Sequence, residues 1–436
     1  MLQLRLPLIV MPLAVAAMAC TQVAPEDLAF PPSSTVKASV EATPSTTSTL
    51  MPSLVVPPVV VTLDDLSGSI ALAGAPELGT SLPTGEQVWA APAETRFSQP
   101  TWLRDGTRSI FFDYDPRVEG SGRIYSVEAA TGTWTTAEAR RPYFFFSPSY
   151  GGDFFAALGP GSTGTALDIL DSTGQPASDQ SLHAGSFYLA WEPGGDDLLL
   201  HRDATLELAR DPLDLENREP LGEPGQSFLA PSWIPGTREA LIATTTIDGN
   251  RLIRINVDTG EEVDLGPVSG TVGLVVAPDG SRALVANGAA SGGDLAIANR
   301  RVETVAGATE IIDLSTGARE LVSEEPAFWA EWSRDGSRLV LLQEAKGGTA
   351  GVEWVIWEDG AMMELGMFSP SPSFFRNYVF FAWQFVESPR VWSPDGQAVV
   401  YGGIESDGTP GIYVHRIGAE QPDRISDGDV AFWSPR

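Results

Sequence analysis

The chain has 436 residues, and 57 acidic residues against 27 lysines and arginines give a formal net charge of −30. A surface this acidic repels nucleic-acid phosphates and anionic lipid headgroups, so we expect neither as a direct partner. Hydrophobic residues make up 43% of the sequence, enough for a large core, and the 44 glycines and 34 prolines favour a turn-rich β protein over a helical one.

Residues 1–19 have the pattern of a secretory signal peptide. Arg5 precedes an apolar run, Leu6 to Ala17, that is too short to span a membrane. The small residues before Cys20, the only cysteine, resemble the cleavage motif of bacterial lipoproteins, in which the cysteine becomes the lipidated N-terminus. Ordinary signal cleavage after Ala17-Met18-Ala19 is the alternative. We predict lipidation at Cys20, because an unpaired cysteine at this place in a secreted protein is otherwise hard to explain.

Residues 20–62 are predicted to form a flexible tether. They are rich in Ser, Thr, Pro, Val and Ala and carry almost no charge, so they bury too little apolar surface to offset the entropy of ordering. The apolar stretch Leu54 to Val61 is short and broken by Pro57 and Pro58, which argues against a second membrane crossing. The membrane is therefore expected to be reached through the N-terminal lipid only.

One pattern recurs through residues 63–436: an aromatic residue, a turn with Pro or Arg followed by Asp-Gly, and an apolar run. The clearest copies begin at Trp102, Trp332 and Trp392, as in Trp392-Ser393-Pro394-Asp395-Gly396. Looser copies begin at Phe146, Trp191, Trp233 and Val276, and a truncated copy begins at Trp433. Most copies are 41 to 45 residues apart and two intervals are 56 and 60. A period in the low forties is that of a four-stranded propeller blade.

The chemistry of one repeat supports this reading. Pro fixes φ, Asp can bond to its own backbone and Gly takes the positive φ of the turn, after which the apolar run predicts a buried strand. A second turn signal, such as Asp258-Thr259-Gly260, follows the half-exposed alternation of Arg251 to Val257. Each repeat therefore predicts a meander of four strands. Because these turns recur as structure, their Asp and Gly residues are expected to be structural and not catalytic.

The two ends of the propeller region are predicted to share one blade. Gly68 to Ala73, Gln87 to Ala91 and Thr95 to Ser98 read as three strands without an innermost strand before them. Val430 to Trp433 reads as an innermost strand with nothing after it. Joining them removes exposed sheet edges. Seven contiguous units and this shared unit predict an all-β, eight-bladed propeller. Seven blades is the alternative, because the copies at Phe146 and Val276 depart most from the pattern.

The Trp-Ser-Pro-Asp-Gly repeats with their apolar strands resemble those of TolB-type (WD40-like, PD40) propellers, which also occur in prolyl oligopeptidases. The resemblance covers roughly residues 66–436. It implies a propeller fold but no particular activity, because the motif is a structural turn. The chain has no room for the hydrolase domain of a prolyl oligopeptidase. The tether stands where a TolB protein carries a small α/β domain, so TolB partners are not carried over.

Two repeats are longer than the others, and their extra residues are predicted to lie on one face of neighbouring blades. They span about Gly288 to Ala308 and Phe368 to Phe385. We expect the aromatics Phe380, Phe381 and Trp383 in the core, and Phe374, Phe375 and Tyr378 exposed. Aromatic and arginine side chains on an acidic protein suit a saccharide, a carboxylated polymer or a protein partner. The predicted contacts are Arg300, Arg301, Phe374, Phe375, Arg376 and Tyr378.

Catalytic motifs are not found in the sequence. The histidines His183, His201 and His415 lie in different repeats, and no metal, phosphate-loop or nucleophile-elbow motif is present, so no cofactor is expected. We predict a monomeric, non-enzymatic binding or scaffolding lipoprotein of the bacterial outer membrane or cell surface, with an envelope protein or polymer as partner. The alternative is an envelope hydrolase or lyase using carboxylates in the propeller channel, for which Asp113 and Asp115 are a candidate pair.

Overall fold

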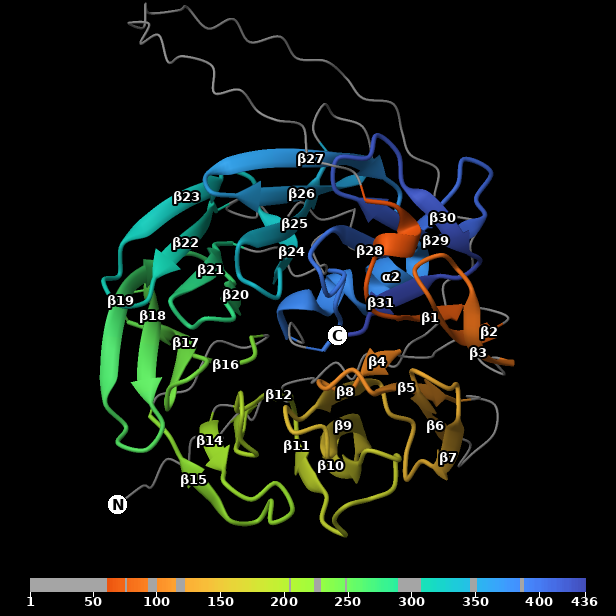
Figure 1. Cartoon of the computed structure of the whole chain (residues 1–436). Helices are drawn as coiled ribbons and strands as arrows, with labels where there is room; N and C mark the ends of the chain where they lie inside the picture. Colours follow the sequence, from red (N-terminus) through yellow and green to blue (C-terminus); the bar gives the residue numbers. More distant parts are fainter. Residues whose placement is uncertain are drawn as a thin grey trace, which may run out of the picture. The chain divides into compact units, whose positions relative to one another are not determined.

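Eight antiparallel sheets are arranged as the blades of a ring within residues 58–436 (Figure 1). The computed structural model describes residues 61–436, except 75–76, 93–99, 115–121, 204, 223–228, 248, 289–306, 346–350 and 385–387. The prediction of an all-β propeller is confirmed, and the count is eight blades rather than seven. Cys20, the signal-like segment and most of the predicted tether lie outside the described residues. The described helices include none long and apolar enough to cross a membrane.

The blades are numbered here from the one that contains both ends of the described chain, and the strands of each are given from the innermost outward. Blade 1 contains β31 (Val430–Trp433), β1 (Ile70–Gly74), β2 (Glu77–Ser81) and β3 (Gln87–Pro92), and blade 2 contains β4 (Thr101–Trp102), β5 (Arg108–Asp113), β6 (Arg123–Glu128) and β7 (Trp134–Glu138). Blade 3 contains β8 (Phe145–Pro148), β9 (Phe154–Gly161), β10 (Gly164–Asp171) and β11 (Leu182–Ala184). Blade 4 contains β12 (Phe187–Trp191), β13 (Leu198–Arg202), β14 (Thr205–Ala209) and β15 (Arg218–Pro220).

Blades 5 to 7 follow the same plan. Blade 5 contains β16 (Ser232–Trp233), β17 (Glu239–Thr246), β18 (Gly249–Asn256) and β19 (Glu262–Val268). Blade 6 contains β20 (Gly273–Val276), β21 (Arg282–Ala286), β22 (Thr309–Asp313) and β23 (Arg319–Ser323). Blade 7 contains β24 (Ala327–Trp332), β25 (Arg338–Glu344), β26 (Val352–Glu358) and β27 (Ala361–Phe368). Blade 8 has three regular strands, β28 (Ala398–Ile404), β29 (Pro410–Arg416) and β30 (Asp423–Ser426). A 3₁₀ helix, η1 (Leu63–Asp65), precedes β1.

Blade 1 closes the ring as predicted. The C-terminal strand β31 pairs with β1, and Ile70 lies opposite Trp433 and Ala73 opposite Val430. The prediction for the other strands of this blade was partly wrong. The strand next to β1 is β2, Glu77–Ser81, and residues 87–92 form the outermost strand. The predicted strand at Thr95 to Ser98 lies outside the described residues.

The turn of each clear repeat holds its shape through the side chains that the motif supplies. In blade 7, a carboxylate oxygen of Asp335 accepts hydrogen bonds from the Ser337 backbone N–H at 3.0 Å and the Ser333 hydroxyl at 2.7 Å. Gly336 follows with φ of +72°, a value that residues with a Cβ rarely adopt. The Asp and Gly residues of this turn are therefore structural.

Five of the repeat tryptophans join a blade to the one before it. Each of the five is buried, and its indole N–H donates to a backbone carbonyl of the preceding innermost strand at 2.9–3.0 Å. The bonds run from Trp102 to Phe432, Trp191 to Ser147, Trp233 to Ala190, Trp332 to Val275, and Trp392 to Glu331. Apolar layers between adjacent blades make up the core, for example between blades 6 and 7. The aromatic residue of the repeat is thus an inter-blade connection as well as the end of a strand.

Candidate functional site

The innermost strand of blade 8 is built from two separate pieces of chain. Pro370 forms a bridge with Gly403 of β28, and Trp392 forms a bridge with Val399 of the same strand. Only a short stretch of β28 separates these bridges, whereas a long stretch separates Pro370 from Trp392. That long stretch forms a short helix, α2 (Pro372–Asn377), and a 3₁₀ helix, η2 (Val379–Gln384). Both helices lie inside the ring of blades (Figure 1). We call residues 371–384 and 388–390 the plug.

Local chemistry and packing both hold the plug in place. Ser371 caps α2 by accepting the Phe374 N–H at 3.1 Å, and Pro372 occupies the first turn. The Trp383 ring fits against Gly273 of blade 6, where an added Cβ would lie 2.3 Å from the ring. Position 273 therefore needs glycine for close approach, and the plug contacts blade 6 as well as blade 8.

The prediction that Phe374 and Tyr378 are exposed was wrong. Phe374 is 0% exposed and Tyr378 is 6% exposed. They are four residues apart and so share one helical face, and that face packs on Trp329 and Phe432 of blades 7 and 1. Neither side chain is available as a surface contact for a ligand.

The remaining predicted contacts have mixed outcomes. Phe375 is half-buried against the same core, and Arg376 is exposed at the end of α2. Trp383 is buried, as expected, while Phe381 is half-buried and the side chain of Phe380 lies outside the described residues. Arg300, Arg301 and Asp115 also lie outside the described part of the chain. The structure therefore does not bring the six predicted contacts together on one open face.

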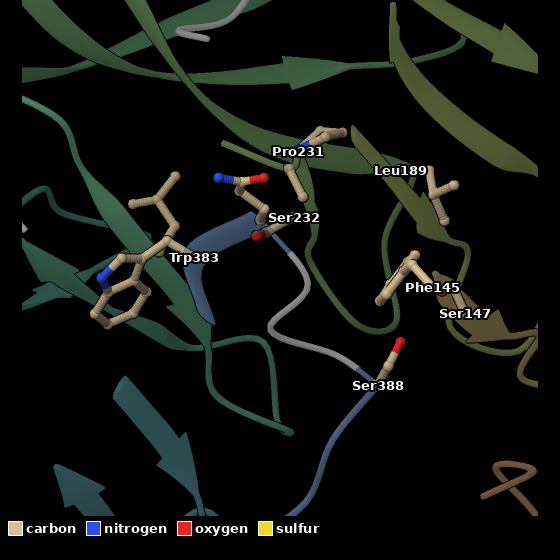
Figure 2. Close-up of a pocket in the computed structure, with 10 residues that line it drawn as sticks. Phe145, Ser147, Leu189, Pro231, Ser232, Trp383 and Ser388 are labelled. Atoms are coloured by element: carbon tan, nitrogen blue, oxygen red, sulfur yellow. The ribbon is translucent and has the colours of Figure 1, made fainter. Parts of the chain in front are cut away.

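The plug leaves only a small cavity beside it (Figure 2). Trp383, Gln384 and Ser388 of the plug line one side, and the innermost strands of blades 3 to 6, with the residues just before β16, line the rest. The lining residues from the blades are Phe145, Ser147, Leu189, Ala230, Pro231, Ser232 and Leu274. The cavity measures about 10 Å³, room for about one water molecule. A saccharide unit does not fit there.

One buried carboxyl group, that of Glu331, lies where the plug rejoins blade 8. It accepts the Val391 backbone N–H at 2.7 Å and lies 3.6 Å from the Arg390 guanidinium. Burial raises the pKa of Glu331 to about 7, against the opposing effects of Arg390, these backbone bonds and Arg104. The group therefore changes charge near neutral pH. Among the described residues, no group of three or more His, Cys, Asp or Glu side chains is placed to hold a metal ion.

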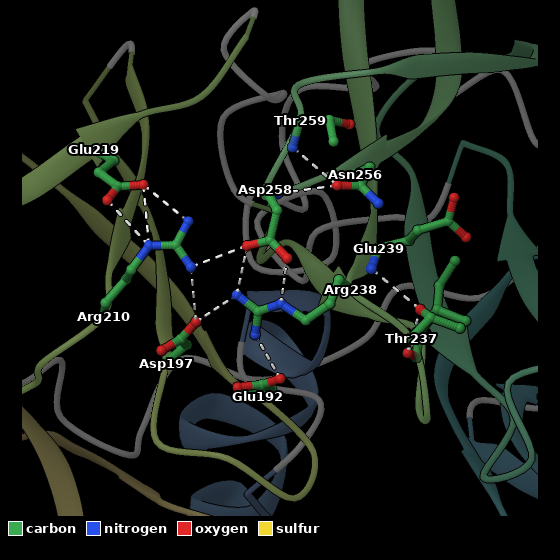
Figure 3. Close-up of polar contacts among 11 residues, drawn as sticks. Glu192, Asp197, Arg210, Glu219, Thr237, Arg238, Glu239, Asn256, Asp258 and Thr259 are labelled. Carbon is green, nitrogen blue, oxygen red and sulfur yellow. Dashed lines mark hydrogen bonds and ion pairs between the residues drawn. The ribbon is translucent and has the colours of Figure 1, made fainter.

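A network of arginines and carboxylates joins blades 4 and 5 (Figure 3). Arg238 contacts Glu192 at 2.6 Å, Asp197 at 2.6 Å and Asp258 at 3.0 Å. Arg210 adds bonds to Asp258 and Glu219. The Arg238 and Arg210 guanidinium groups lower the pKa of Asp258 to about 2. Because its charges pair with each other, this network stabilises the joint between blades and does not present a free charge to a ligand.

A larger opening, the 7–8 groove, lies between blade 7 and blade 8. Its volume is about 390 Å³, within the range of small-molecule sites. One wall is the end of β27 with Ser369, and the other is formed by β28, β29 and the loop that follows β29. The lining residues are Leu365, Gly366, Met367, Phe368, Ser369, Tyr401, Gly403, Ile404, Tyr413, His415, Glu420, Gln421 and Pro422.

Three aromatic rings form a continuous wall in this groove. The rings of Phe368 and Tyr401 are 4.2 Å apart, and Tyr401 and Tyr413 are 5.7 Å apart and nearly parallel. Gly403 makes room for this wall, since a Cβ there would lie 3.2 Å from the Tyr413 ring. Tyr413 is half-buried, so part of its ring is accessible. Aromatic walls of this kind provide a large contact area at low entropic cost.

Polar groups also line the groove. His415 is buried, its Nε2 lies 3.1 Å from the Ala419 carbonyl, and burial lowers its pKa, so the imidazole is neutral at pH 7. Glu420 and Gln421 are exposed at the rim. Glu420 makes no ion pair with any described residue. It is also the one charged residue among those that line the groove.

Comparison with known proteins supports the fold. Neither a protein family nor a curated protein matches this chain. Among solved structures, dihydro-heme d1 dehydrogenase NirN is similar with a TM-score of 0.55 and 14% identity, over 84% of this chain and 75% of NirN. The chain is a β-propeller. An oligogalacturonate lyase in complex with manganese gives 0.50 and 13%, over 81% and 96%. TolB from Acinetobacter baumannii is also similar, with 0.40 and 15%, over 74% and 82%. At these identities the likeness is one of fold alone.

The sequence analysis missed the 7–8 groove and its residues. A weak signal exists, because Tyr401 stands where the preceding repeat has Leu341. Each is nine residues after its motif tryptophan and two residues after the strand partner of that tryptophan. An aromatic residue replacing an aliphatic one at a blade interface marks a joint that is packed differently. The other residues of the groove come from separate parts of the sequence and carry no shared pattern.

Proposed function

We propose that this protein is an exported, lipid-anchored binding protein whose ligand occupies the 7–8 groove, and that it does not act as an enzyme. One observation carries the proposal: the described chain offers a 390 Å³ groove with an aromatic wall, while the plug reduces the cavity beside it to about 10 Å³. A ligand-sized concavity that combines aromatic surface with a few polar groups is the usual form of a small-ligand site.

The proposed location rests on the N-terminal sequence. Residues 1–19 have the features of a signal peptide, and Cys20 follows them at the position where lipoproteins are modified. We propose that residues 20–62 link the lipid to the propeller and keep the groove clear of the membrane surface. The strongly acidic composition suits this arrangement, because it opposes adhesion of the propeller to anionic headgroups.

Replacing Cys20 with alanine tests the anchor. In a bacterial host that expresses the full chain, we expect the wild type to incorporate labelled fatty acid and the Cys20→Ala variant to incorporate none, because the thioether-forming side chain is gone. Thr21→Ala is the matched control and should label like the wild type. Label in Cys20→Ala, or its absence from the wild type, would contradict the lipoprotein assignment.

The groove itself is tested by thermal shift of the full chain in nonionic detergent. The ligand panel comprises envelope saccharides, peptidoglycan fragments, short peptides and small organic ions. A ligand at a hundred times its Kd should stabilise the fold by about 2.7 kcal/mol. We expect Tyr413→Leu to reduce this shift, because it removes the accessible ring of the groove.

The control is Trp134→Leu, which removes a half-exposed aromatic ring from the outermost strand of blade 2, away from the groove. It should keep the ligand-induced shift. If every ligand that binds the wild type binds Tyr413→Leu equally well, the binding site lies elsewhere and the proposed function of the groove fails.

A further inference from the structure

We infer that the ligand of the 7–8 groove is a small organic cation, an ammonium group carried on an apolar stem. This inference rests on the proposed function, because it assigns a chemical class to the ligand of the same groove. It departs from the sequence-based expectation of a carboxylated polymer, and the reason lies in the charges of the groove.

The residues that line the groove include one negative charge and no positive charge. Its one charged lining residue is Glu420, and its imidazole, His415, is neutral at pH 7. The nearby arginines are paired with carboxylates: Arg416 pairs with Asp423 at 2.9 Å, and Arg424, which lies beside the Tyr413 hydroxyl, pairs with Glu405 at 2.9 Å. A carboxylate or phosphate entering the groove would meet a carboxylate at the rim and find no cation lining the site. A cation entering the groove would instead meet the Glu420 carboxylate as a partner of opposite charge.

The aromatic wall favours the same sign of charge. The face of an aromatic ring carries negative potential, and an ammonium group within about 6 Å of a Tyr or Phe ring centre is attracted to it. Tyr413 offers a partly accessible ring, and Tyr401 lies behind it in a nearly parallel stack. Their ring centres are 5.7 Å apart, so both rings belong to the same wall of the groove.

The remaining lining suits an apolar stem next to that charge. Leu365, Met367 and Ile404 contribute aliphatic and thioether surface. Met367 is 54% exposed, an unusual position for a large apolar side chain. A flexible thioether adapts to the shape of a bound group. At the level of the whole protein, the formal charge of −30 raises the local concentration of cations and speeds their association.

Three probes of one shape and different charge test the class of ligand. They are choline, its uncharged tert-butyl isostere dimethylbutanol, and the corresponding dimethylbutanoate. Binding to the full chain in nonionic detergent is measured by calorimetry. We expect choline to bind about tenfold or more tightly than the alcohol, and the carboxylate to bind least, because shape and apolar area are matched and only charge differs.

Paired variants separate the two contributions. Tyr413→Phe keeps the ring face and should bind choline like the wild type, whereas Tyr413→Leu should weaken it roughly threefold to thirtyfold. Glu420→Gln should weaken choline several-fold and leave the alcohol unchanged. Its control is Glu324→Gln, which changes the net charge equally at an exposed site on the turn between β23 and β24.

Each outcome decides the matter. Selectivity for choline that Tyr413→Leu and Glu420→Gln both reduce supports the inference. Equal binding of choline and alcohol, tighter binding of the carboxylate, or no binding of choline overturns it. In those cases the proposed function still stands if another ligand of the panel is lost in Tyr413→Leu. It falls only if no ligand depends on Tyr413.

Discussion

Replacement of Trp332 by alanine is expected to lower the free energy of unfolding by about 3–5 kcal/mol, the usual cost of deleting a buried indole. Its ring is buried between blades 6 and 7, where it contacts Trp357 edge-on at 6.2 Å and Arg282 at 4.7 Å. The Trp332 indole N–H also donates to the Val275 carbonyl at 3.0 Å. The substitution therefore opens a cavity and breaks the link between two blades.

Trp332→Phe separates the hydrogen bond from the packing. It keeps most of the apolar volume but leaves the Val275 carbonyl without its donor, for which we expect a loss of about 1–3 kcal/mol. Urea denaturation followed by far-ultraviolet circular dichroism measures both variants, and Trp134→Ala on the half-exposed position of blade 2 should cost less than either. A Trp332→Phe variant as stable as the wild type would show that the indole bond contributes nothing.

Replacement of Glu331 by glutamine is expected to stabilise the protein above pH 7 by about 3 kcal/mol and to change little below pH 4.5. The pKa of Glu331 rises from 4.5 to about 7 on folding, because its carboxyl group is buried. Between these two values the folded state binds the proton more tightly than the unfolded state, so stability falls as pH rises through this window. Glutamine remains neutral throughout and removes that dependence.

The measurement is the difference in unfolding free energy between Glu331→Gln and the wild type at pH 5 and at pH 8. We expect a much larger difference at pH 8. The control, Glu324→Gln, exchanges an exposed carboxylate and should show a similar difference at both values. A pH-independent difference for Glu331→Gln would mean that Arg390 keeps the carboxylate ionised in the folded protein across the range, contrary to the raised pKa.

The blades could be predicted from the sequence because the residues that define each repeat act locally. The turn residues, such as Asp335 and Gly336, shape the backbone within a few positions of themselves in the sequence. The motif tryptophan indicates the strand that precedes the turn. Ring closure by Val430–Trp433 followed from counting strands at the two ends. The strand Glu77–Ser81 was missed because it follows β1 so closely that the two read as one segment.

The plug and the groove depend on residues that the sequence does not place side by side. Whether Phe374 faces solvent or core is decided by Trp329 and Phe432, which lie on other blades. In the same way, Phe368 and Tyr413 meet Tyr401 only because blades 7 and 8 pack together. Local patterns report hydrophobicity and turns, but they do not report which surfaces meet in the folded ring.

The pairing of β31 with β1 has a consequence for biosynthesis. Ile70 pairs with Trp433, which is synthesised 363 residues later. At typical translation rates of about 5–20 residues per second, that delay is on the order of half a minute. During that time β1 has an unpaired edge, the kind of edge that recruits strands from other chains. The edge of β1 therefore stays open until Val430 to Trp433 have been made, and a chain that stops before Val430 cannot close the ring.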